Sequence, residues 1–348
     1  MPSAFSFLGI FANTNSLAMK VAVFSTKSYD RDFLGKFNTN NEHELTYFEA
    51  SLNAYTTNLT LGFEAVCVFV NDKVDRETVK KISRNGIRII ALRCAGFNNV
   101  DISAANENNI KVVRVPAYSP QAVAEHAVAL ILTLNRKTHK AYNRIREGNF
   151  SLDRLIGFNL YHKTAGVIGT GKIGAIFCGL MQGFGCKVLA FDNYESDELK
   201  KKGVEYMSFD EILEQSDIIS LHCPLTPETH HLFNSHAFSK LKNGAMIINT
   251  SRGAVIDTSD AIDALKSGKL GYLGIDVYEQ EEKLFFRDLS ESIIQDDLFL
   301  RLMSFPNVLI TSHQGFFTKE ALDEISVTTI KNLSDFEKGF VLENEVQM

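Results

Sequence analysis

Short runs of β-branched and aromatic residues alternate with longer amphipathic stretches from Lys20 onward. In the first third of the chain, the runs typical of strands lie at 20–26, 44–49, 65–70, 87–93 and 111–115. A second series follows at 164–169, 187–192, 217–222, 245–251, 272–278 and 307–313. Strands that alternate with helices indicate parallel βαβ units, so the pattern predicts an α/β protein. Because the alternation comes in two series, we expect two α/β halves.

The stretch between the two series predicts one long helix. It reads "SPQAVAEHAVALILTLNRKTHKAYNRIREG" over 119–148, with Ser119 suited to cap it and Pro120 suited to its first turn. Its length suits an element that links the two halves. Residues 281–306 are charged and aromatic without a clear period, which predicts an extended loop with short helical pieces. From Thr318 the pattern is helical again.

The composition is that of a globular protein and excludes several classes. A length of 348 residues favours two domains. The net charge of −6 argues against a dedicated nucleic-acid binder, which usually has a basic surplus. The cysteines are odd in number and form no C-x-x-C pair, so we expect neither a disulfide framework nor a metal site. They are Cys67, Cys94, Cys178, Cys186 and Cys223.

The first 18 residues stand apart from this pattern. They are mildly apolar but have no Lys or Arg before the apolar part, so they fit a secretory signal poorly. We expect a flexible extension or an alternative start. No run reaches the ~18–20 apolar residues of a membrane span, and a reducing cytoplasm fits best.

The second series opens on a glycine-rich turn, "GVIGTGKIG" (166–174). Its glycines, Gly169, Gly171 and Gly174, permit a tight turn, close approach to a pyrophosphate, and close packing of helix on strand. The turn follows a strand-like run and precedes a helical pattern, as a dinucleotide site requires. The helix N-terminus offers free N–H groups and a positive dipole end to the phosphates.

An acidic residue after the next strand supports the same interpretation. "KVLAFD" ends in Asp192, and the motif requires an acid about 20 residues beyond the turn to bind the ribose 2′-hydroxyl. An acid there repels a 2′-phosphate, and the following "NYES" supplies no Arg to receive one. The sequence therefore predicts NAD rather than NADP as the cofactor.

Three further stretches carry chemistry at the carboxyl ends of strand-like runs, where open α/β sheets bind ligands. "INTSRG" supplies Arg252, whose guanidinium can bind a carboxylate in bidentate fashion. "LITSHQGFF" supplies His313. "GIDVYEQEE" supplies the acids Asp276, Glu279, Glu281 and Glu282. Behind a dinucleotide turn, an Arg, a carboxylate and a His form the set that reduction of a 2-keto acid requires.

These motifs, in this order, resemble the signatures of the NAD-dependent D-2-hydroxyacid dehydrogenase family. They are "GVIGTGKIG", "LHCPLTPETHHLFN", "MIINTSRGAVID", "GIDVYEQEE" and "NVLITSHQGF". The resemblance runs from about Lys20 to near the C-terminus. Within the family the chain is most similar to the fermentative D-lactate dehydrogenases, whose "DVYE-x-E" and "IQDD" loop it shares.

The resemblance implies two doubly wound parallel-sheet domains. A Rossmann cofactor domain is expected over 119–314. A flavodoxin-like, discontinuous substrate domain is expected over 19–118 and 315–348, with the active cleft between the two. The family's habit of pairing through the cofactor domain makes a homodimer or a higher homo-oligomer the expected assembly. A small 2-keto or 2-hydroxy acid is the expected substrate.

The resemblance also implies roles for individual residues. His313 would be the general acid and base, Glu281 its carboxylate partner, and Arg252 the group that holds and polarises the substrate. The backbone N–H groups of Ala95 and Gly96 would bind the substrate carboxylate, and Tyr118 and Phe316 would line the substrate pocket. The expected cofactor contacts are Gly169, Thr170, Gly171, Lys172, Ile173, Gly174, Asp192, His222, Cys223, Pro224, Thr229, Thr250, Ser251 and Asp276.

Several alternatives remain open. Phosphoglycerate, glyoxylate and hydroxypyruvate reductases are the nearest, although "CAGFNN" (94–99) offers no basic residue for a phosphate and only Arg93 precedes it. Formate dehydrogenases pair the His with Gln where this chain has Glu281. Relatives of a different class use NAD to control co-repressor assembly. One departure from the family pattern is Ser312, where many members have Pro.

Overall fold

The computed structural model describes residues 18–347 and divides the chain into two compact units. The first unit comprises Met1–Tyr118 and Leu322–Met348, and the second comprises Ser119–Ala321. The predicted extension at 1–18 lies, apart from Ala18, outside the described residues. No helix in the described part of the chain is long and apolar enough to span a bilayer.

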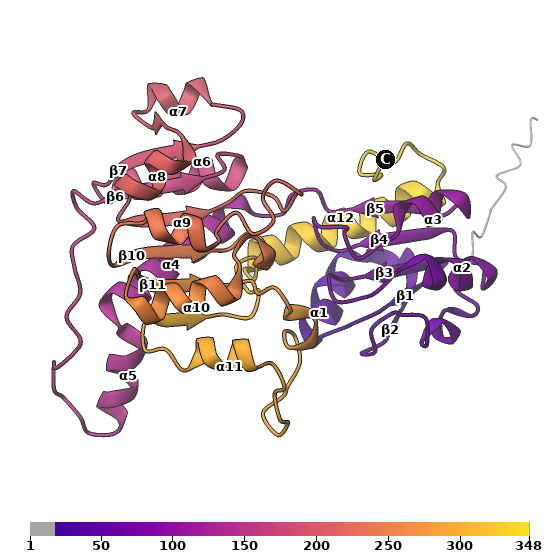
Figure 1. The fold of residues 1–348 in the computed structure, drawn as a ribbon. Coiled ribbons are helices and arrows are strands. Elements are labelled where there is room, and N and C mark those ends of the chain that lie inside the picture. The colour runs from indigo at the N-terminus through magenta and orange to yellow at the C-terminus, as the bar shows by residue number, and fades with distance from the viewer. Residues whose placement is uncertain (1–17, 348) are drawn as a thin grey trace, which may run out of the picture. The chain divides into compact units, whose positions relative to one another are not determined.

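A five-stranded parallel sheet forms the centre of the first unit (Figure 1). Its strands run in the order β2 (His43–Tyr47), β1 (Met19–Val23), β3 (Ala65–Val68), β4 (Ile89–Leu92) and β5 (Lys111–Arg114). β3 and β4 are buried at every position, as expected of parallel strands covered on both faces. The helices of this unit are α1 (Ser28–Phe37), α2 (Arg76–Arg84), α3 (Ile102–Glu107) and, from Leu322 onward, α12 (Lys319–Glu337).

A seven-stranded parallel sheet forms the centre of the second unit. Its order is β12 (Val308–Ile310), β11 (Leu270–Ile275), β10 (Ala245–Asn249), β9 (Ile218–Leu221), β6 (Thr164–Ile168), β7 (Lys187–Phe191) and β8 (Glu205–Tyr206). The chain order reverses between β6 and β9, and open α/β sheets bind ligands at such a switch point. Both sheets are parallel, so the predicted α/β class with two doubly wound sheets is confirmed.

Alternate strand residues of the second sheet enter two separate apolar clusters, one on each face. Ile219 and Ile247 pack in the cluster of α8 (Phe209–Gln215), α9 (Ser235–Lys240) and α10 (Thr258–Ser267). Ile218 and Ile248 pack in the cluster of α4 (Pro120–Arg136) and α6 (Lys172–Gly183). Successive side chains of a strand point to opposite faces of the sheet, so a continuous hydrophobic run supplies residues to both clusters.

The prediction of one helix over 119–148 is wrong, because the chain forms two. Ser119 caps α4 through the Ala122 N–H, with Pro120 in the first turn, as predicted. The helix ends at Lys137, which has φ 52° and ψ 34°, and α5 (Thr138–Arg146) begins directly after it. No residue of α5 is buried. The core therefore provides no contact that would favour α5 continuing α4 as one straight helix.

Two smaller elements complete the second unit. The predicted loop at 281–306 contains the 3₁₀ turn η4 (Glu281–Lys283) and the short helix α11 (Asp297–Met303). The two-residue strand β8 was not predicted, because so short a run carries no periodicity. The helix α7 (Asp197–Lys201) precedes it.

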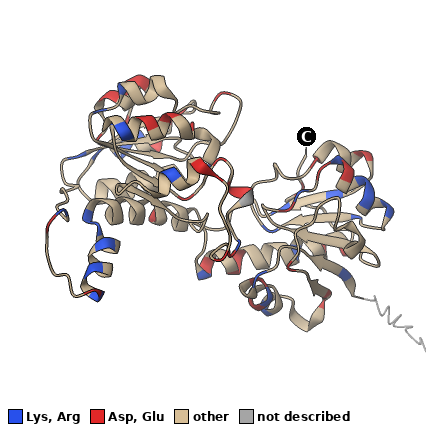
Figure 2. Cartoon of the chain, turned by 60° about the horizontal axis from the view of Figure 1, so that its bottom comes forward, with Lys and Arg blue, Asp and Glu red and all other residues tan. Residues whose placement is uncertain are grey.

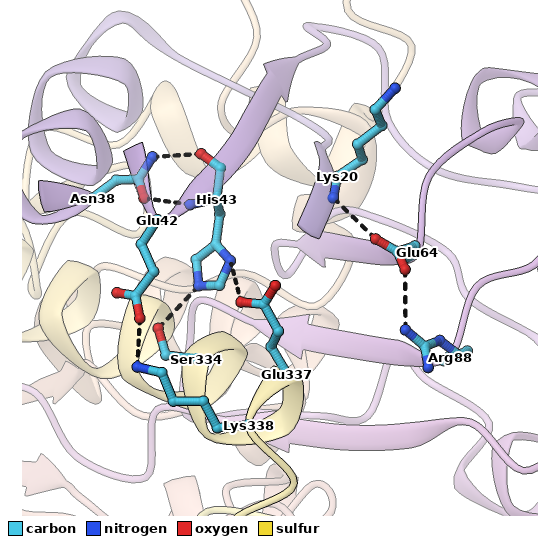
Figure 3. A network of polar contacts seen from close by, with 9 residues as sticks. All are labelled: Lys20, Asn38, Glu42, His43, Glu64, Arg88, Ser334, Glu337 and Lys338. Atoms are coloured by element: carbon cyan, nitrogen blue, oxygen red, sulfur yellow. Dashed lines mark hydrogen bonds and ion pairs between the residues drawn. The ribbon is translucent and has the colours of Figure 1, made fainter. Parts of the chain in front are cut away.

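A buried histidine joins the edge strand of the first sheet to the C-terminal helix (Figure 3). The His43 ring is 1% exposed; its Nε2 lies 3.0 Å from Ser334 Oγ and its Nδ1 lies 3.6 Å from the Glu337 carboxylate. Burial lowers the pKa of His43, although Glu337 and Glu42 oppose the shift; Lys338 adds to it. The folded state therefore favours the neutral ring.

This burial predicts that the free energy of unfolding depends on pH through His43. The unfolded chain protonates its histidine near pH 6.5, whereas folded His43 takes up its proton only at lower pH. The contribution of neutral His43 is therefore complete above pH ~6.5 and is lost as the pH falls through the lowered pKa. Urea unfolding at several pH values should show the parent losing stability relative to His43→Gln below pH ~6.5. Equal pH slopes for the two proteins would contradict the assignment.

Candidate active site

Three glycines shape the turn between β6 and α6, each in a different way. Gly169 has φ +91°, and a Cβ there would lie 2.7 Å from the backbone nitrogen of Cys223. A Cβ on Gly174 would lie 2.0 Å from the carbonyl oxygen of Gly169, so the helix packs on the turn only because this Cβ is absent. Gly171, the N-cap of α6, faces open space with nothing within 4 Å of its missing Cβ.

Asp192 lies beside this turn, at the carboxyl end of β7. Its Oδ2 accepts hydrogen bonds from the backbone N–H of Thr170 at 2.6 Å and from the Thr170 hydroxyl at 3.1 Å. Its Oδ1 accepts from the Tyr194 N–H at 2.9 Å. An open helix N-terminus next to a fixed carboxylate fits a dinucleotide pyrophosphate and its ribose. The turn and the acid predicted from sequence are thus brought together.

The other residues predicted to contact the cofactor follow the neighbouring strands at the same sheet edge. His222, Cys223 and Pro224 follow β9, and Thr250 and Ser251 follow β10. Burial lowers the pKa of His222 to about 3 and raises that of the Cys223 thiol to about 11, so both groups are neutral at physiological pH.

The loop after β9 is held by a hydroxyl. The Thr229 Oγ1 donates to the Pro224 carbonyl at 2.6 Å and accepts from the Thr226 N–H at 2.8 Å. Thr229 therefore holds the turn at 224–229 in shape.

Arg252 follows β10 and is only partly buried. Its Nη1 donates to the Ser251 carbonyl at 2.7 Å, and its own carbonyl accepts from Asn249 Nδ2 at 2.9 Å. A Cβ on Gly253 would lie 2.1 Å from the carbonyl carbon of Tyr278, so this loop packs directly on the segment after β11. Among the described residues, Arg252 makes no hydrogen bond or ion pair with Glu281 or His313; it shares with them only the sheet edge.

Glu281 and His313 form a direct pair. The imidazole Nδ1 lies 2.8 Å from Glu281 Oε1, and Glu281 Oε2 accepts from the Tyr278 N–H at 3.0 Å. The carboxylate is therefore fixed on two sides and orients the ring. Within the described residues, His313 Nε2 makes no hydrogen bond, so this nitrogen is available for acid–base work.

Asp276 holds the turn on which His313 lies. Its side chain accepts from the N–H groups of Gln314 at 2.9 Å and Gly315 at 2.8 Å, and its carbonyl accepts from the His313 N–H at 2.7 Å. His313 has φ +55°, a left-handed conformation that costs free energy in a non-glycine residue. The hydrogen bonds that Asp276 accepts stabilise that conformation.

The sequence interpretation missed a second histidine at this site. His126 of α4 lies 3.3 Å from Asp276 Oδ1 and 3.0 Å from Thr311 Oγ1, and the Thr311 hydroxyl donates to the same carboxylate oxygen. Burial by itself would raise the pKa of Asp276, but hydrogen bonds from His126 and Thr311 outweigh it and lower the pKa. His126 lies in the stretch "PAYSPQAVAEHAVAL". Its role in the site becomes evident only from its contact with Asp276, the residue after β11.

The remaining acids and pocket residues are dispersed. Glu279 pairs with His231, with its Oε1 2.6 Å from Nε2, and accepts from Thr258, while Glu282 is exposed. Ala95, Gly96 and Tyr118 belong to the first unit. Phe316 belongs to the second unit, where it is 7% exposed and its ring contacts that of Phe317.

A parallel sheet with a dinucleotide turn at its switch point and a carboxylate-held imidazole at the same edge defines a dinucleotide-dependent oxidoreductase. Residues 128–315 match the model of the D-isomer specific 2-hydroxyacid dehydrogenase NAD-binding domain. The chain belongs to the D-isomer specific 2-hydroxyacid dehydrogenase family, and its cofactor is NAD.

Individual relatives agree with this membership. The chain is 54% identical to a D-lactate dehydrogenase of Escherichia coli over 94% of its own length and 100% of the relative. It is 51% identical to 2-hydroxyacid dehydrogenase homolog 1 of Schizosaccharomyces pombe, over 91% of this chain and 96% of that protein. It is also similar to the solved structure of D-lactate dehydrogenase from Aquifex aeolicus with NAD and lactic acid, at TM-score 0.83 and 35% identity, covering 94% and 98%.

The glycine packing predicts a selective loss of cofactor binding. Gly174→Ala places a Cβ against the Gly169 carbonyl, so we expect α6 to move away from the turn and the Kd for NADH to rise by about tenfold or more. Gly179→Ala in the same helix is the matched control, because nothing lies within 4 Å of its Cβ position and Ala favours the helix. Fluorescence titration with NADH measures both. Unchanged binding by Gly174→Ala would show that this contact does not shape the cofactor site.

Proposed function

We propose that this protein catalyses the reversible reduction of pyruvate to D-lactate with NADH. The main support is the His313–Glu281 pair, which lies at the same sheet edge as the dinucleotide turn. The relatives named as D-lactate dehydrogenases support the choice of substrate.

His313 is the proton donor and acceptor in this proposal. Its Nδ1 is committed to Glu281 at 2.8 Å, so the proton leaves and returns at Nε2. The Glu281 carboxylate fixes the orientation and tautomer of the ring through Nδ1. Asp276, through the 313–315 turn, holds the ring in place.

Arg252 stabilises negative charge on the substrate. Its guanidinium is the donor fork at this edge that is suited to the carboxylate and carbonyl oxygens of a 2-keto acid. A fixed donor aimed at the carbonyl oxygen is worth most as charge develops there. NAD, when bound, supplies or accepts the hydride.

Further roles complete the proposal. The turn Gly169–Gly174 would hold the dinucleotide and Asp192 its ribose hydroxyl. The further cofactor contacts would come from His222, Cys223, Pro224, Thr229, Thr250, Ser251 and Asp276 at the same sheet edge. The N–H groups of Ala95 and Gly96 bind the substrate carboxylate, and Tyr118 and Phe316 border the substrate's methyl group. The first unit is thus the substrate domain, and the second the NAD domain.

Replacing the proton donor gives the decisive test. His313→Ala should lower kcat for pyruvate reduction by about 10²–10⁴-fold, because no other group protonates the developing alkoxide. The Kd for NADH should stay within about threefold, since the dinucleotide turn is untouched. Turnover is followed by NADH absorbance over a panel of 2-keto acids, with the chirality of the product determined.

Three outcomes would contradict the proposal. A kcat within about tenfold of the parent would remove His313 from its role. L-lactate as product would overturn the stereochemistry. NADH binding without turnover of any 2-keto acid would favour a binding protein that senses NAD.

We also propose that the protein is a cytoplasmic homodimer that pairs through the second unit. Large apolar side chains are exposed on one continuous segment, at Tyr142 (62%), Ile145 (55%), Phe150 (74%), Leu152 (82%), Ile156 (83%) and Tyr161 (64%). Exposed apolar residues gathered in this way mark interfaces. Acidic and basic residues are otherwise interspersed over both units (Figure 2). All five cysteines are free, which suits a reducing compartment.

Removing apolar area from this segment should separate the subunits. Phe150→Ser combined with Leu152→Ser is expected to give monomers at micromolar concentration in light scattering, with the fold retained by circular dichroism. Tyr55→Ser removes an equally exposed ring, 95% accessible, from the first unit and should leave the mass unchanged. An unaltered mass for the double variant would place the interface elsewhere.

A further inference from the structure

The loop after β4 presents two backbone N–H groups that the described protein leaves without acceptors. Ala95 and Gly96 lie in this loop, at the carboxyl edge of the first sheet. Within residues 18–347, neither N–H donates a hydrogen bond. Successive backbone N–H groups that converge in a turn can bind an anion.

The end of β5 determines which way these two groups point. The Cys94 carbonyl accepts from the Val115 N–H at 3.2 Å, and the Ala95 carbonyl accepts from Arg114 Nη1 at 2.8 Å. In a trans peptide the C=O and the following N–H point in opposite directions. The Cys94 carbonyl faces the Val115 N–H just after β5 and the Ala95 carbonyl faces the Arg114 guanidinium, so the N–H groups of Ala95 and Gly96 point away from these two partners.

The Arg114 side chain makes a second contact with the same loop. Its guanidinium carbon lies 5.1 Å from the centre of the Phe97 ring, a cation–π distance. The backbone of Arg114 is fixed from the other side, where its N–H donates to the Asn344 carbonyl at 3.1 Å and its carbonyl accepts from Asn332 Nδ2 at 3.0 Å. A firmly held arginine therefore fixes the Ala95 peptide and the Phe97 ring together.

The loop is anchored at both ends as well. Arg93, 2% exposed, pairs with Asp30 at 3.0 Å and donates to the Ser25 carbonyl at 3.0 Å. At the far end, Asn99 Nδ2 donates to the carbonyls of Phe69 and Asp72. With both ends fixed, the peptide between Ala95 and Gly96 is the part that Arg114 orients.

We propose that Arg114 is a positioning residue for the substrate carboxylate. By holding the Ala95 carbonyl, it aims the Gly96 N–H at the carboxylate, and its charge makes the loop more attractive to an anion. This inference rests on the proposed function, in which Ala95 and Gly96 bind that carboxylate. A planar guanidinium that both donates and stacks is required, so lysine is an incomplete replacement.

The test compares three variants. Arg114→Met keeps the length but removes the donor and the charge, and Arg114→Lys keeps the charge. Arg88→Met is the matched control, because Arg88 also combines a polar contact (Glu64, 3.1 Å) with an aromatic one (Phe336, 5.5 Å), but at the amino end of β4. Figure 3 shows the contact between Arg88 and Glu64.

We expect the KM for pyruvate to rise about tenfold in Arg114→Met while kcat changes by less than about threefold, because the carboxylate is bound equally in ground and transition states. Arg114→Lys should lie between this variant and the parent, and Arg88→Met should match the parent. The inhibition constant of oxamate, a pyruvate analogue with the same carboxylate, should rise in parallel with KM. The Kd for NADH should stay constant.

The outcomes separate this inference from the proposed function. Lower kcat or Tm with unchanged KM and unchanged oxamate affinity would mean that Arg114 is only structural, and would overturn the inference while the function stands. If the parent reduces no 2-keto acid, the proposed function fails. Oxamate binding to the NADH complex then decides the inference by itself: weaker binding by Arg114→Met supports it, and equal binding overturns it.

Discussion

The buried carboxylate of Asp276 is the constraint on which the site depends. It directly follows β11, and its oxygens accept from the Gln314 and Gly315 N–H groups and from Thr311. A lone buried carboxylate is costly, but these donors together with His126 offset its desolvation, and its pKa is lowered despite burial. The left-handed backbone of His313 is held by this carboxylate together with the Asp276 carbonyl, and the His126 contact couples it to the packing of α4.

Parallel pairing of the strands aligns the other segments of the site with Asp276 at one edge of the sheet. The order β12-β11-β10-β9-β6-β7 brings the segments bearing His313, Asp276, Arg252, His222, the glycine turn and Asp192 to one edge. These residues are distant along the chain, and only strand order makes them neighbours. Short-range contacts then fix each segment, such as the packing of the Gly253 backbone on the Tyr278 backbone. The geometry of the site is thus distributed over many short-range contacts on a rigid scaffold.

Much of this arrangement could be predicted from sequence because its signals are local. Strand runs, the cap at Ser119, the glycine spacing and Asp192 each depend on a few consecutive residues. The break at Lys137 could not be predicted, because the helical pattern continues through it and the end of α4 depends on burial that periodicity does not report. His126 was missed for a related reason. The role of a histidine in an amphipathic helix depends here on its contact with Asp276, 150 residues away along the chain. The role of Arg114 likewise depends on a tertiary contact, with the Ala95 carbonyl.

The buried cysteines have a consequence for chemical resistance. Oxidants and alkylating agents attack the thiolate, and burial raises the pKa of Cys67 and Cys223 to about 11 and that of Cys178 to about 12. Cys223 adjoins the dinucleotide turn, yet it carries almost no thiolate at neutral pH. These three buried thiols are therefore poor nucleophiles toward peroxide and alkylating agents.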